Sequence, residues 1–366
     1  MFPATSLSKL FNIEYPIVQA PMAGGPTTPE LVAAVSNAGG LGSLAAGMLS
    51  PDAIRQGVAE VRRRTKKPFA INLFLLEKPH PAADEVASAL KLLEPFRNEL
   101  GLPPGTPLEK YCEDPAEQFD AVLEAAPAVV SFTFGILTSD QIAKFKNRGS
   151  LVVGTATTVA EAKSWEKVGA DAVCTQGSEA GAHRGTFLGD FVTALVGTMA
   201  LVPQCVDAVR IPVIAAGGIM DGRGIAASLM LGAVGSQLGT AFMRCPEAGT
   251  TSVWKDAIRS ARDDQTRVTR VYSGRAARGI VNDFMQRMLP VEKEIPPYPV
   301  QNALTGEIRR AAAKANRPEF LSLWAGQAAS LSREMPAADL IVALVTETIA
   351  ALDLHGGKVR GAGSLE

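Results

Sequence analysis

Short apolar runs recur along the chain, separated by stretches with helical patterning. Eight of the runs are almost continuously apolar, as strands buried on both faces of a parallel sheet are. The predicted strands are PIVQA, LGSLAAG, FAINLF, AVVSFTFG, LVVGTAT, DAVCTQG, PVIAAGG and GSQLGTAF. Because the unit of strand, loop and helix repeats eight times, the sequence predicts an α/β fold with a closed (β/α)8 TIM barrel rather than an open doubly wound sheet.

Helix boundaries are marked as well. Thr28 and Pro29 open the helix in PELVAAVSNAGG, and Thr158 and Glu161 have the spacing of a capping box before AKSWEKVG. A hydroxyl before the first turn, proline at the first position and glycine at the end are the usual helix signals. The helices between the strands are therefore predicted independently of their apolar periodicity.

Two segments interrupt the repeat, and both follow a strand. Residues 75–120 are rich in proline and charge, and residues 245–330 indicate several helices. Barrel enzymes keep their chemistry at this face, so both segments are candidate substrate covers. We predict a ligand-binding barrel over residues 1–244, a helical insertion over 245–330 after the eighth strand, and a C-terminal helix with a tail over 331–366. A detached second domain over 245–330 is the alternative.

Glycines cluster after the last two predicted strands. Gly217 and Gly218 lie in AAGGIMDGRG, before a helix that starts near Asp221, and Gly239 and Thr240 lie in QLGTAF. Glycine lets the backbone approach a ligand, and barrels commonly hold a phosphate between the loops after strands seven and eight. We expect a phosphate site here, contacted also by the N-terminus of the helix. Two tight turns without a ligand are the alternative.

Among the three histidines, His183 is the candidate catalytic base. It lies in TQGSEAGAHRGTF, directly after the sixth predicted strand, whereas His80 and His355 lie in loop or terminal sequence. Histidine suits proton transfer near neutral pH. Glu179 in the same loop is the alternative base.

Two amides end apolar strands, namely Asn72 in FAINLF and Gln176 in CTQG. An amide both donates and accepts, so each could bond the edge of a flavin ring, or simply neighbouring backbone. Met22 and Gly24, after the first strand in APMAGG, would place an apolar surface and a flexible backbone beside such a ring.

These segments together resemble the first class of nitronate monooxygenases, formerly called 2-nitropropane dioxygenases. QAPMAGGPTTPELVAAVSNAGGLGSLAAG, CTQGSEAGAHRGTF, IPVIAAGGIMDGRGIAASLMLGAVGSQLGTAF and PPYPVQNALTGEIR carry the resemblance. It implies a barrel that holds FMN non-covalently, with His183 as the base. It also implies cofactor contacts at Asn72, Gln176, Gly181, Gly218, Gln237, Leu238, Gly239 and Thr240.

The resemblance further places aromatic residues over the substrate, at Tyr111 and Tyr298. Asn302 and Gly306 depart from it, since bulkier or charged groups are expected there. The implied reaction is oxidation of an alkyl nitronate, such as propionate 3-nitronate, by O2 to a carbonyl compound and nitrite, with Arg184 as a candidate for the charge of a nitronate acid.

Three alternatives remain open. A flavin barrel that uses NAD(P)H to reduce quinones or enoyl-acyl carrier protein shares the AGGLG and AAGGI elements. An inosine-monophosphate-dehydrogenase-like barrel would need a loop cysteine as nucleophile, and Cys174 lies inside a strand. The third is a non-catalytic FMN binder.

Composition excludes several other classes. Lys and Arg (36) nearly balance Asp and Glu (37), so no basic surface field is expected for nucleic acid. Four cysteines without a C-x-x-C pair argue against structural zinc and a disulfide framework. No apolar stretch is long enough to span a membrane. We expect a cytoplasmic monomer or homodimer whose partners are a small nitronate and O2, and no metal. The final GSLE is typical of a cloning remnant.

Overall fold

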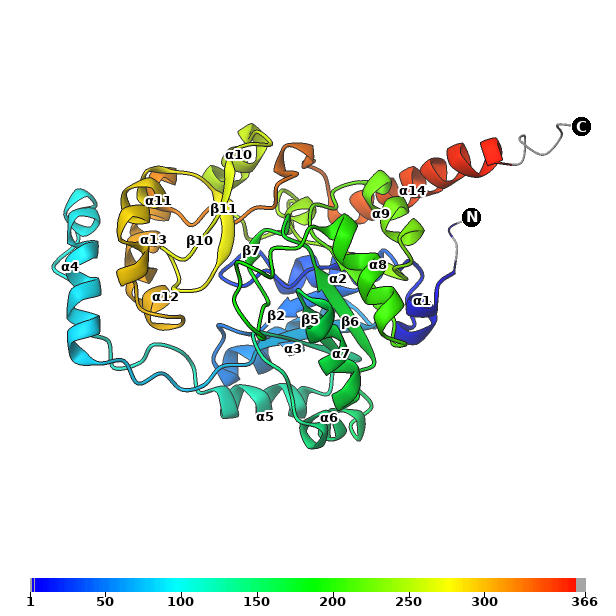
Figure 1. Ribbon diagram of the computed structural model, residues 1–366, viewed down its shortest axis with the longest axis horizontal. Coiled ribbons are helices and arrows are strands. Elements are labelled where there is room, and N and C mark those ends of the chain that lie inside the picture. Colours follow the sequence, from blue (N-terminus) through cyan, green and yellow to red (C-terminus); the bar gives the residue numbers. More distant parts are fainter. Residues whose placement is uncertain (1, 3, 360–366) are drawn as a thin grey trace, which may run out of the picture.

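The eight predicted strands form one parallel sheet in a computed structural model that describes residue 2 and residues 4–359, with side chains omitted for 354–359 (Figure 1). Neighbouring strands follow the order β1-β9-β8-β6-β5-β4-β3-β2. The strands are β1 (Ile17–Gln19), β2 (Gly42–Ala45), β3 (Phe69–Phe74), β4 (Val129–Thr133), β5 (Leu151–Ala156), β6 (Ala172–Gln176), β8 (Val213–Ala216) and β9 (Gly235–Leu238). The barrel predicted from the sequence is confirmed.

The sheet closes between its first and second strands. β1 pairs with β9 on one side, and on the other a parallel bridge joins Val18 to Leu41. The amide of Leu41 donates to the carbonyl of Ile17 and the amide of Gln19 donates to that of Leu41, each at 2.9 Å. Both edges are therefore paired, as a barrel requires.

Helices cover the outside of the barrel. They are α2 (Pro29–Asn37), α3 (Pro51–Arg64), α5 (Pro115–Ala125), α6 (Ser139–Lys146), α7 (Val159–Val168), α8 (Thr198–Ala208), α9 (Gly222–Met230) and α14 (Ala337–Val359). Helix α1 (Ser6–Phe11) instead packs Leu7 and Phe11 against side chains inside the barrel. The predicted caps are formed, since the hydroxyls of Thr28 and Thr158 accept from the amides of Leu31 and Glu161. The long α14 contacts α9 and α2, beside the point where the barrel closes.

The two interrupting segments pack against each other and form one lobe over the barrel. Helix α4 (Ala83–Glu99) comes from the first segment and lies beside α12 and α13 from the second (Figure 1). Phe96 of α4 contacts Phe284, with ring centroids 4.4 Å apart, inside a shared apolar cluster. Elements of the second segment are α10 (Ser252–Ser260), β10 (Thr266–Thr269), β11 (Ala277–Ile280), α11 (Asp283–Met288), η2 (Leu289–Glu294), α12 (Val300–Leu304), α13 (Gly306–Lys314), η3 (Pro318–Phe320) and η4 (Ala329–Leu331).

The second segment contains two strands in addition to the predicted helices. Strands β10 and β11 form an antiparallel hairpin, and β11 also pairs with β7 (Ala182–His183), which lies in the loop after β6. These strands are short and their partners lie far away in sequence, so local periodicity does not reveal them. The pairing joins the lobe to the predicted catalytic loop.

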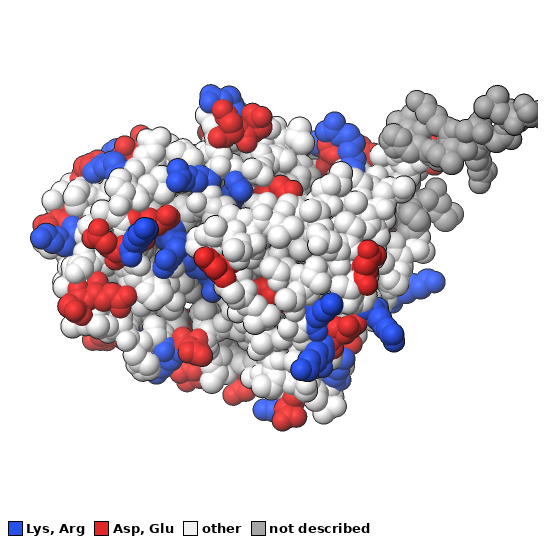
Figure 2. Space-filling view, in the orientation of Figure 1, with Lys and Arg blue, Asp and Glu red and all other residues white. Residues whose placement is uncertain are grey.

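Charged side chains of both signs are interspersed over the visible face, without a large field of one sign (Figure 2). Within residues 2 and 4–359, no helix is long and apolar enough to cross a membrane. His355 and the terminal GSLE lie outside the residues whose side chains are described.

Candidate active site

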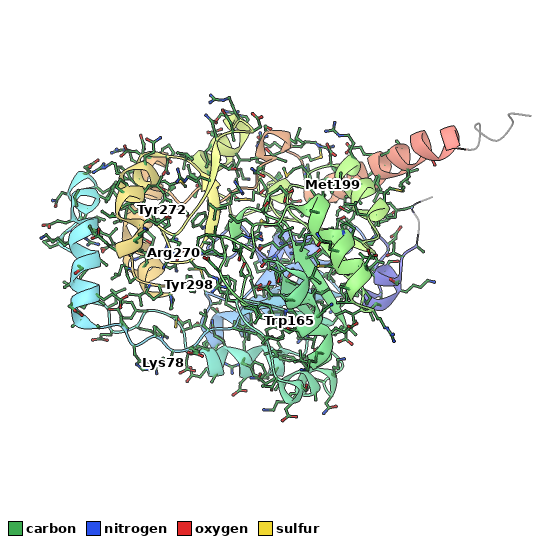
Figure 3. All side chains as sticks on the ribbon, viewed as in Figure 1. Lys78, Trp165, Met199, Arg270, Tyr272 and Tyr298 are labelled. Atoms are coloured by element: carbon green, nitrogen blue, oxygen red, sulfur yellow. The ribbon has the colours of Figure 1, made fainter. Side chains whose placement is uncertain are left out.

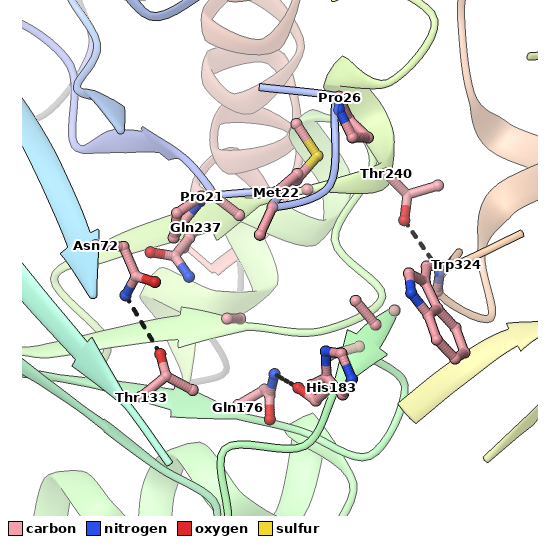
Figure 4. Close-up of a pocket in the computed structure, with 18 of the residues that line it drawn as sticks. Pro21, Met22, Pro26, Asn72, Thr133, Gln176, His183, Gln237, Thr240 and Trp324 are labelled. Atoms are coloured by element: carbon pink, nitrogen blue, oxygen red, sulfur yellow. Dashed lines mark hydrogen bonds between the residues drawn. The ribbon is translucent and has the colours of Figure 1, made fainter. Parts of the chain in front are cut away.

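A cavity lies where the carboxyl ends of the barrel strands meet the lobe (Figure 4). The barrel contributes the loops after β1, β3, β6, β8 and β9, and the lobe contributes residues from its last helices and the segment that follows them. Eleven of the predicted site residues line this cavity, namely Met22, Gly24, Asn72, Gln176, Gly181, His183, Gly217, Gly218, Gln237, Gly239 and Thr240.

Three other predicted residues lie elsewhere. Leu238 is 1% exposed and faces the helices outside the barrel, because successive side chains of a strand point to opposite faces. Tyr111 packs at the edge of the apolar cluster of the lobe and does not line the cavity. Tyr298 lies beside His183 and lines an adjoining cavity. Figure 3 shows Tyr298 between the helices of the lobe and the barrel.

The turn after β8 requires glycine at two positions. Gly217 and Gly218 have φ of +119° and +70°, which disfavours any side chain. A Cβ on Gly217 would lie 2.8 Å from the Thr198 hydroxyl oxygen, and one on Gly218 would lie 3.1 Å from the Cβ of Glu179. The backbone of this turn therefore forms the cavity wall directly.

Helix α9 does not contribute free amides to this wall, contrary to the prediction. The carboxylate of Asp221 caps the helix by accepting from the amides of Arg223 and Gly224, at 3.0 and 3.4 Å. The amide of Gly222 donates to Glu347 from α14, at 3.1 Å. Carboxylates therefore already occupy the N-terminal donors that a phosphate would use.

His183 is held by the lobe as well as by the barrel. Its strand β7 pairs with β11, and its Nε2 lies 2.8 Å from the hydroxyl oxygen of Ser273. That hydroxyl donates its single hydrogen to the carbonyl of Arg275, at 3.0 Å. With the hydroxyl hydrogen directed at Arg275, Nε2 is assigned as the donor to Ser273, which leaves the lone pair on Nδ1.

The imidazole is neutral in its surroundings. Burial lowers the pKa of His183 to about 3, with Arg275 and Arg309 contributing through their positive charges. Aromatic rings enclose it, since the centroids of Tyr298 and Phe134 lie 5.4 and 5.5 Å from that of the imidazole. Because burial and nearby cations both disfavour imidazolium, His183 is available as a base at neutral pH.

The two predicted amides are used differently. Gln176 donates from Nε2 to the carbonyl of His183 at 3.0 Å (Figure 4) and accepts at Oε1 from the amide of Gly185 at 2.9 Å, so it holds the loop that carries His183. Asn72 donates from Nδ2 to the hydroxyls of Ser131 and Thr133, at 3.0 and 3.3 Å. Its Oδ1 accepts from no described residue and remains available to a ligand.

The alternative base, Glu179, is engaged in capping. Both of its carboxylate oxygens accept from the amide of Thr198 at 2.9 Å, and Oε2 also accepts from the Thr198 hydroxyl at 2.8 Å. This carboxylate therefore stabilises the N-terminus of α8.

Residues that the sequence did not single out complete the cavity. Trp324 contacts His183, with ring centroids 5.6 Å apart, while Arg309 and Trp254 line the cavity from the lobe. The indole Nε1 of Trp254 is buried without an acceptor. Their positions depend on contacts between segments more than 100 residues apart in the sequence, as between 183 and 324, which no local motif encodes.

Metal and thiol chemistry find no support in the described part of the chain. It contains no group of three or more His, Cys, Asp or Glu side chains that could hold a metal ion. Cys174 reaches the cavity, but burial raises its thiol pKa to about 12. The thiol stays protonated at neutral pH, so it is a poor nucleophile.

Comparisons with known proteins agree with this geometry. The family model for nitronate monooxygenase matches residues 4–347. A probable nitronate monooxygenase from Staphylococcus saprophyticus is 44% identical over 346 residues, covering 94% of this chain and 97% of that protein.

Two solved structures are also similar over nearly their full length. A nitroalkane oxidase from Streptomyces ansochromogenes has a TM-score of 0.88 and 39% identity, covering 95% of this chain and 99% of that one. FabK from Thermotoga maritima has a TM-score of 0.77 and 31% identity, covering 97% and 99%. The resemblance inferred from the sequence is confirmed, and the chain belongs to the nitronate monooxygenase family of flavin-dependent oxidoreductases.

Proposed function

We propose that this protein binds FMN and uses O2 to oxidise alkyl nitronates to a carbonyl compound and nitrite. The observation that carries the proposal is a neutral imidazole, His183, held inside a cavity that is also lined by the backbone of Gly217 and Gly218. The end of the barrel therefore combines a base with a backbone turn that can bind a phosphate. This combination suits a flavin enzyme whose substrate loses a proton from carbon.

The residues of the cavity fit FMN on several independent grounds. Backbone at Gly217, Gly218 and Gly239 would hold the phosphate, without the amides of α9. The unpaired Oδ1 of Asn72 would accept from the flavin ring. The Nε1 of Trp254 is buried without an acceptor and would be a further hydrogen-bond donor to the cofactor. Bound FMN would supply the electron acceptor, which no side chain here provides.

His183 would hold and move the proton of the substrate at Nδ1, because its Nε2 is committed to Ser273. Burial keeps the imidazole unprotonated at neutral pH, so its lone pair can accept that proton. Neutral nitroalkanes need this step, whereas nitronates have already lost the α-proton. The enclosing rings of Phe134, Tyr298 and Trp324 would keep water from the reacting carbon.

Anaerobic mixing tests the proposal. The purified protein should be yellow and should release FMN on heating. Propionate 3-nitronate should bleach the flavin absorption without O2, and admission of O2 should restore the colour and release nitrite. NADH should not bleach it. Protein that takes up no FMN contradicts the proposal, and bleaching by NADH alone identifies a reductase instead.

A further inference from the structure

A guanidinium without a carboxylate partner projects into the site. Arg309, on α13, lines the cavity, and Asn302 provides its only acceptors among the described residues. Its Nη2 donates to the carbonyl and to the Oδ1 of Asn302, at 2.7 and 3.0 Å. Its Nε is buried with no hydrogen-bond partner.

No described acidic side chain lies within ion-pair distance of Arg309. Ion pairs such as Arg55–Asp52 and Arg259–Asp256 lie at the surface of the molecule instead. Burial lowers the pKa of Arg309 to about 10, so the group is still protonated at neutral pH. Arg309 is partly buried and its Nε fully so; an unpaired charge withdrawn from water in this way is costly, and an anion that enters the cavity would lower that cost.

The other cations nearby are already engaged. Arg275 lies over the ring of Phe134 at 4.0 Å and donates to the carbonyls of Arg184 and Thr186. Arg184, which the sequence suggested for this role, is 1% exposed and donates to three backbone carbonyls at 2.6–3.1 Å. It does not line the cavity. The Nε of Arg184 is also buried without a partner, but Arg309 is the one of these three that both lines the cavity and retains an unused donor.

We propose that Arg309 binds a carboxylate of the substrate and so selects short nitronates that carry a second negative charge. This inference rests on the proposed function for the identity of the substrate, although the anion site can be tested without it. A guanidinium presents two parallel donors that match the two oxygens of a carboxylate. Asn302 and Gly306 lack the bulk or charge expected at those positions. Arg309, one helical turn after Gly306 on α13, provides a charge at the cavity instead.

The first experiment compares two substrates of similar size. Propionate 3-nitronate has a carboxylate where propyl 1-nitronate has a methyl group. Arg309→Met should lower kcat/KM for propionate 3-nitronate by about 100-fold, mainly through KM, as expected when one partner of a buried charge pair is removed. Turnover of propyl 1-nitronate should be nearly unchanged, and Arg309→Lys should restore part of the preference.

The matched control is Arg310→Met, which removes the same charge from an exposed position on the same helix. It should leave both substrates unaffected. Melting temperature and flavin content of each variant establish that it is folded. Equal losses on both substrates in Arg309→Met, or no loss on either, would overturn the assignment.

The second experiment measures binding without turnover. Succinate has a planar anionic group at each end of two carbons, as propionate 3-nitronate does, and it is not oxidised. Its binding to the flavin-loaded protein, followed by the change in visible absorption, should be much tighter than that of butyrate and about 100-fold weaker in Arg309→Met. Indifference between succinate and butyrate would overturn the inference. Succinate binding through Arg309 in a protein that oxidises neither nitronate would support the anion site and refute the proposed function.

Discussion

The Gly218 turn gives the sharpest test of where the FMN phosphate binds. Gly218→Ala introduces a side chain at φ +70°, and its Cβ would lie 3.1 Å from the Cβ of Glu179. Gly189→Ala is the matched control, because Gly189 has φ +76° and nothing within 4 Å of its added Cβ, in an exposed loop outside the cavity. Left-handed backbone costs a non-glycine residue about 1–2 kcal/mol, so both variants should lose this much stability.

Only Gly218→Ala should also lose cofactor. The contact with Glu179 is tight enough that the turn must shift by a few tenths of an ångström, which re-aims the amides of Gly217 and Gly218. A hydrogen bond to a charged group contributes about 1.5–3 kcal/mol. Loss of one such bond should therefore raise the Kd of FMN by about 10–100-fold, since each 1.4 kcal/mol is tenfold.

The assay titrates the apoprotein with FMN and follows the quenching of flavin fluorescence, with thermal unfolding of each apoprotein in parallel. The reasoning is refuted if Gly218→Ala binds FMN with the affinity of the wild type. It is refuted equally if Gly189→Ala loses as much FMN affinity as Gly218→Ala does.

Four further predictions concern His183 and its partner Ser273. His183→Asn should lower turnover of a neutral nitroalkane by about 10²–10⁴-fold and that of a preformed nitronate much less, and equal losses would assign His183 to binding. Because burial lowers the pKa of His183 to about 3, kcat/KM for a neutral nitroalkane should persist as the pH falls through the ordinary value of about 6.5; an acid limb at that value would show a solvated imidazole. The unfolded chain binds this proton more readily than the folded one, so the free energy of unfolding should decrease as the pH is lowered from about 6.5 to about 3. Calorimetry should show a smaller decrease in His183→Asn. Ser273→Ala should lower the turnover of a neutral nitroalkane, because Nε2 loses its partner and can become the basic atom in place of Nδ1. The affinity for FMN should be unchanged, and Ser273→Thr should restore the turnover. Unaltered turnover in Ser273→Ala would show that Ser273 has no part in the mechanism.

The barrel could be predicted from the sequence because both faces of its strands are buried. Runs such as FAINLF and PVIAAGG therefore contain almost no polar interruption, and each maps onto a strand of the structure. The positions of His183 and of the Gly217 turn followed from the same pattern, since loops after parallel strands meet at one end of a barrel. Those predictions needed only the order of strands and helices.

The lobe could not be predicted in this way. The strands TRVT and ARGI are too short for a period-two pattern; they pair with each other, and ARGI also pairs with the distant segment at Ala182. Arg309 stands beside Arg310 in the helix GEIRRAAAK, where the sequence does not show which of the two faces solvent. Only the tertiary structure shows that Arg309 lines the cavity. The error over α9 has a similar origin, because Glu347 reaches its N-terminus from more than 100 residues away.

The antiparallel pairing of β7 with β11 has a consequence for how this protein can be re-engineered. His183 belongs to a three-stranded sheet of which two strands come from the lobe. The loop that carries His183 and the lobe therefore form one structural unit. A chimera that exchanged residues 245–330 alone with a relative would break the register that pairs His183 with Ala277. Grafts intended to change substrate range should carry residues 178–186 together with the lobe, and directed evolution should treat the two segments as a single library.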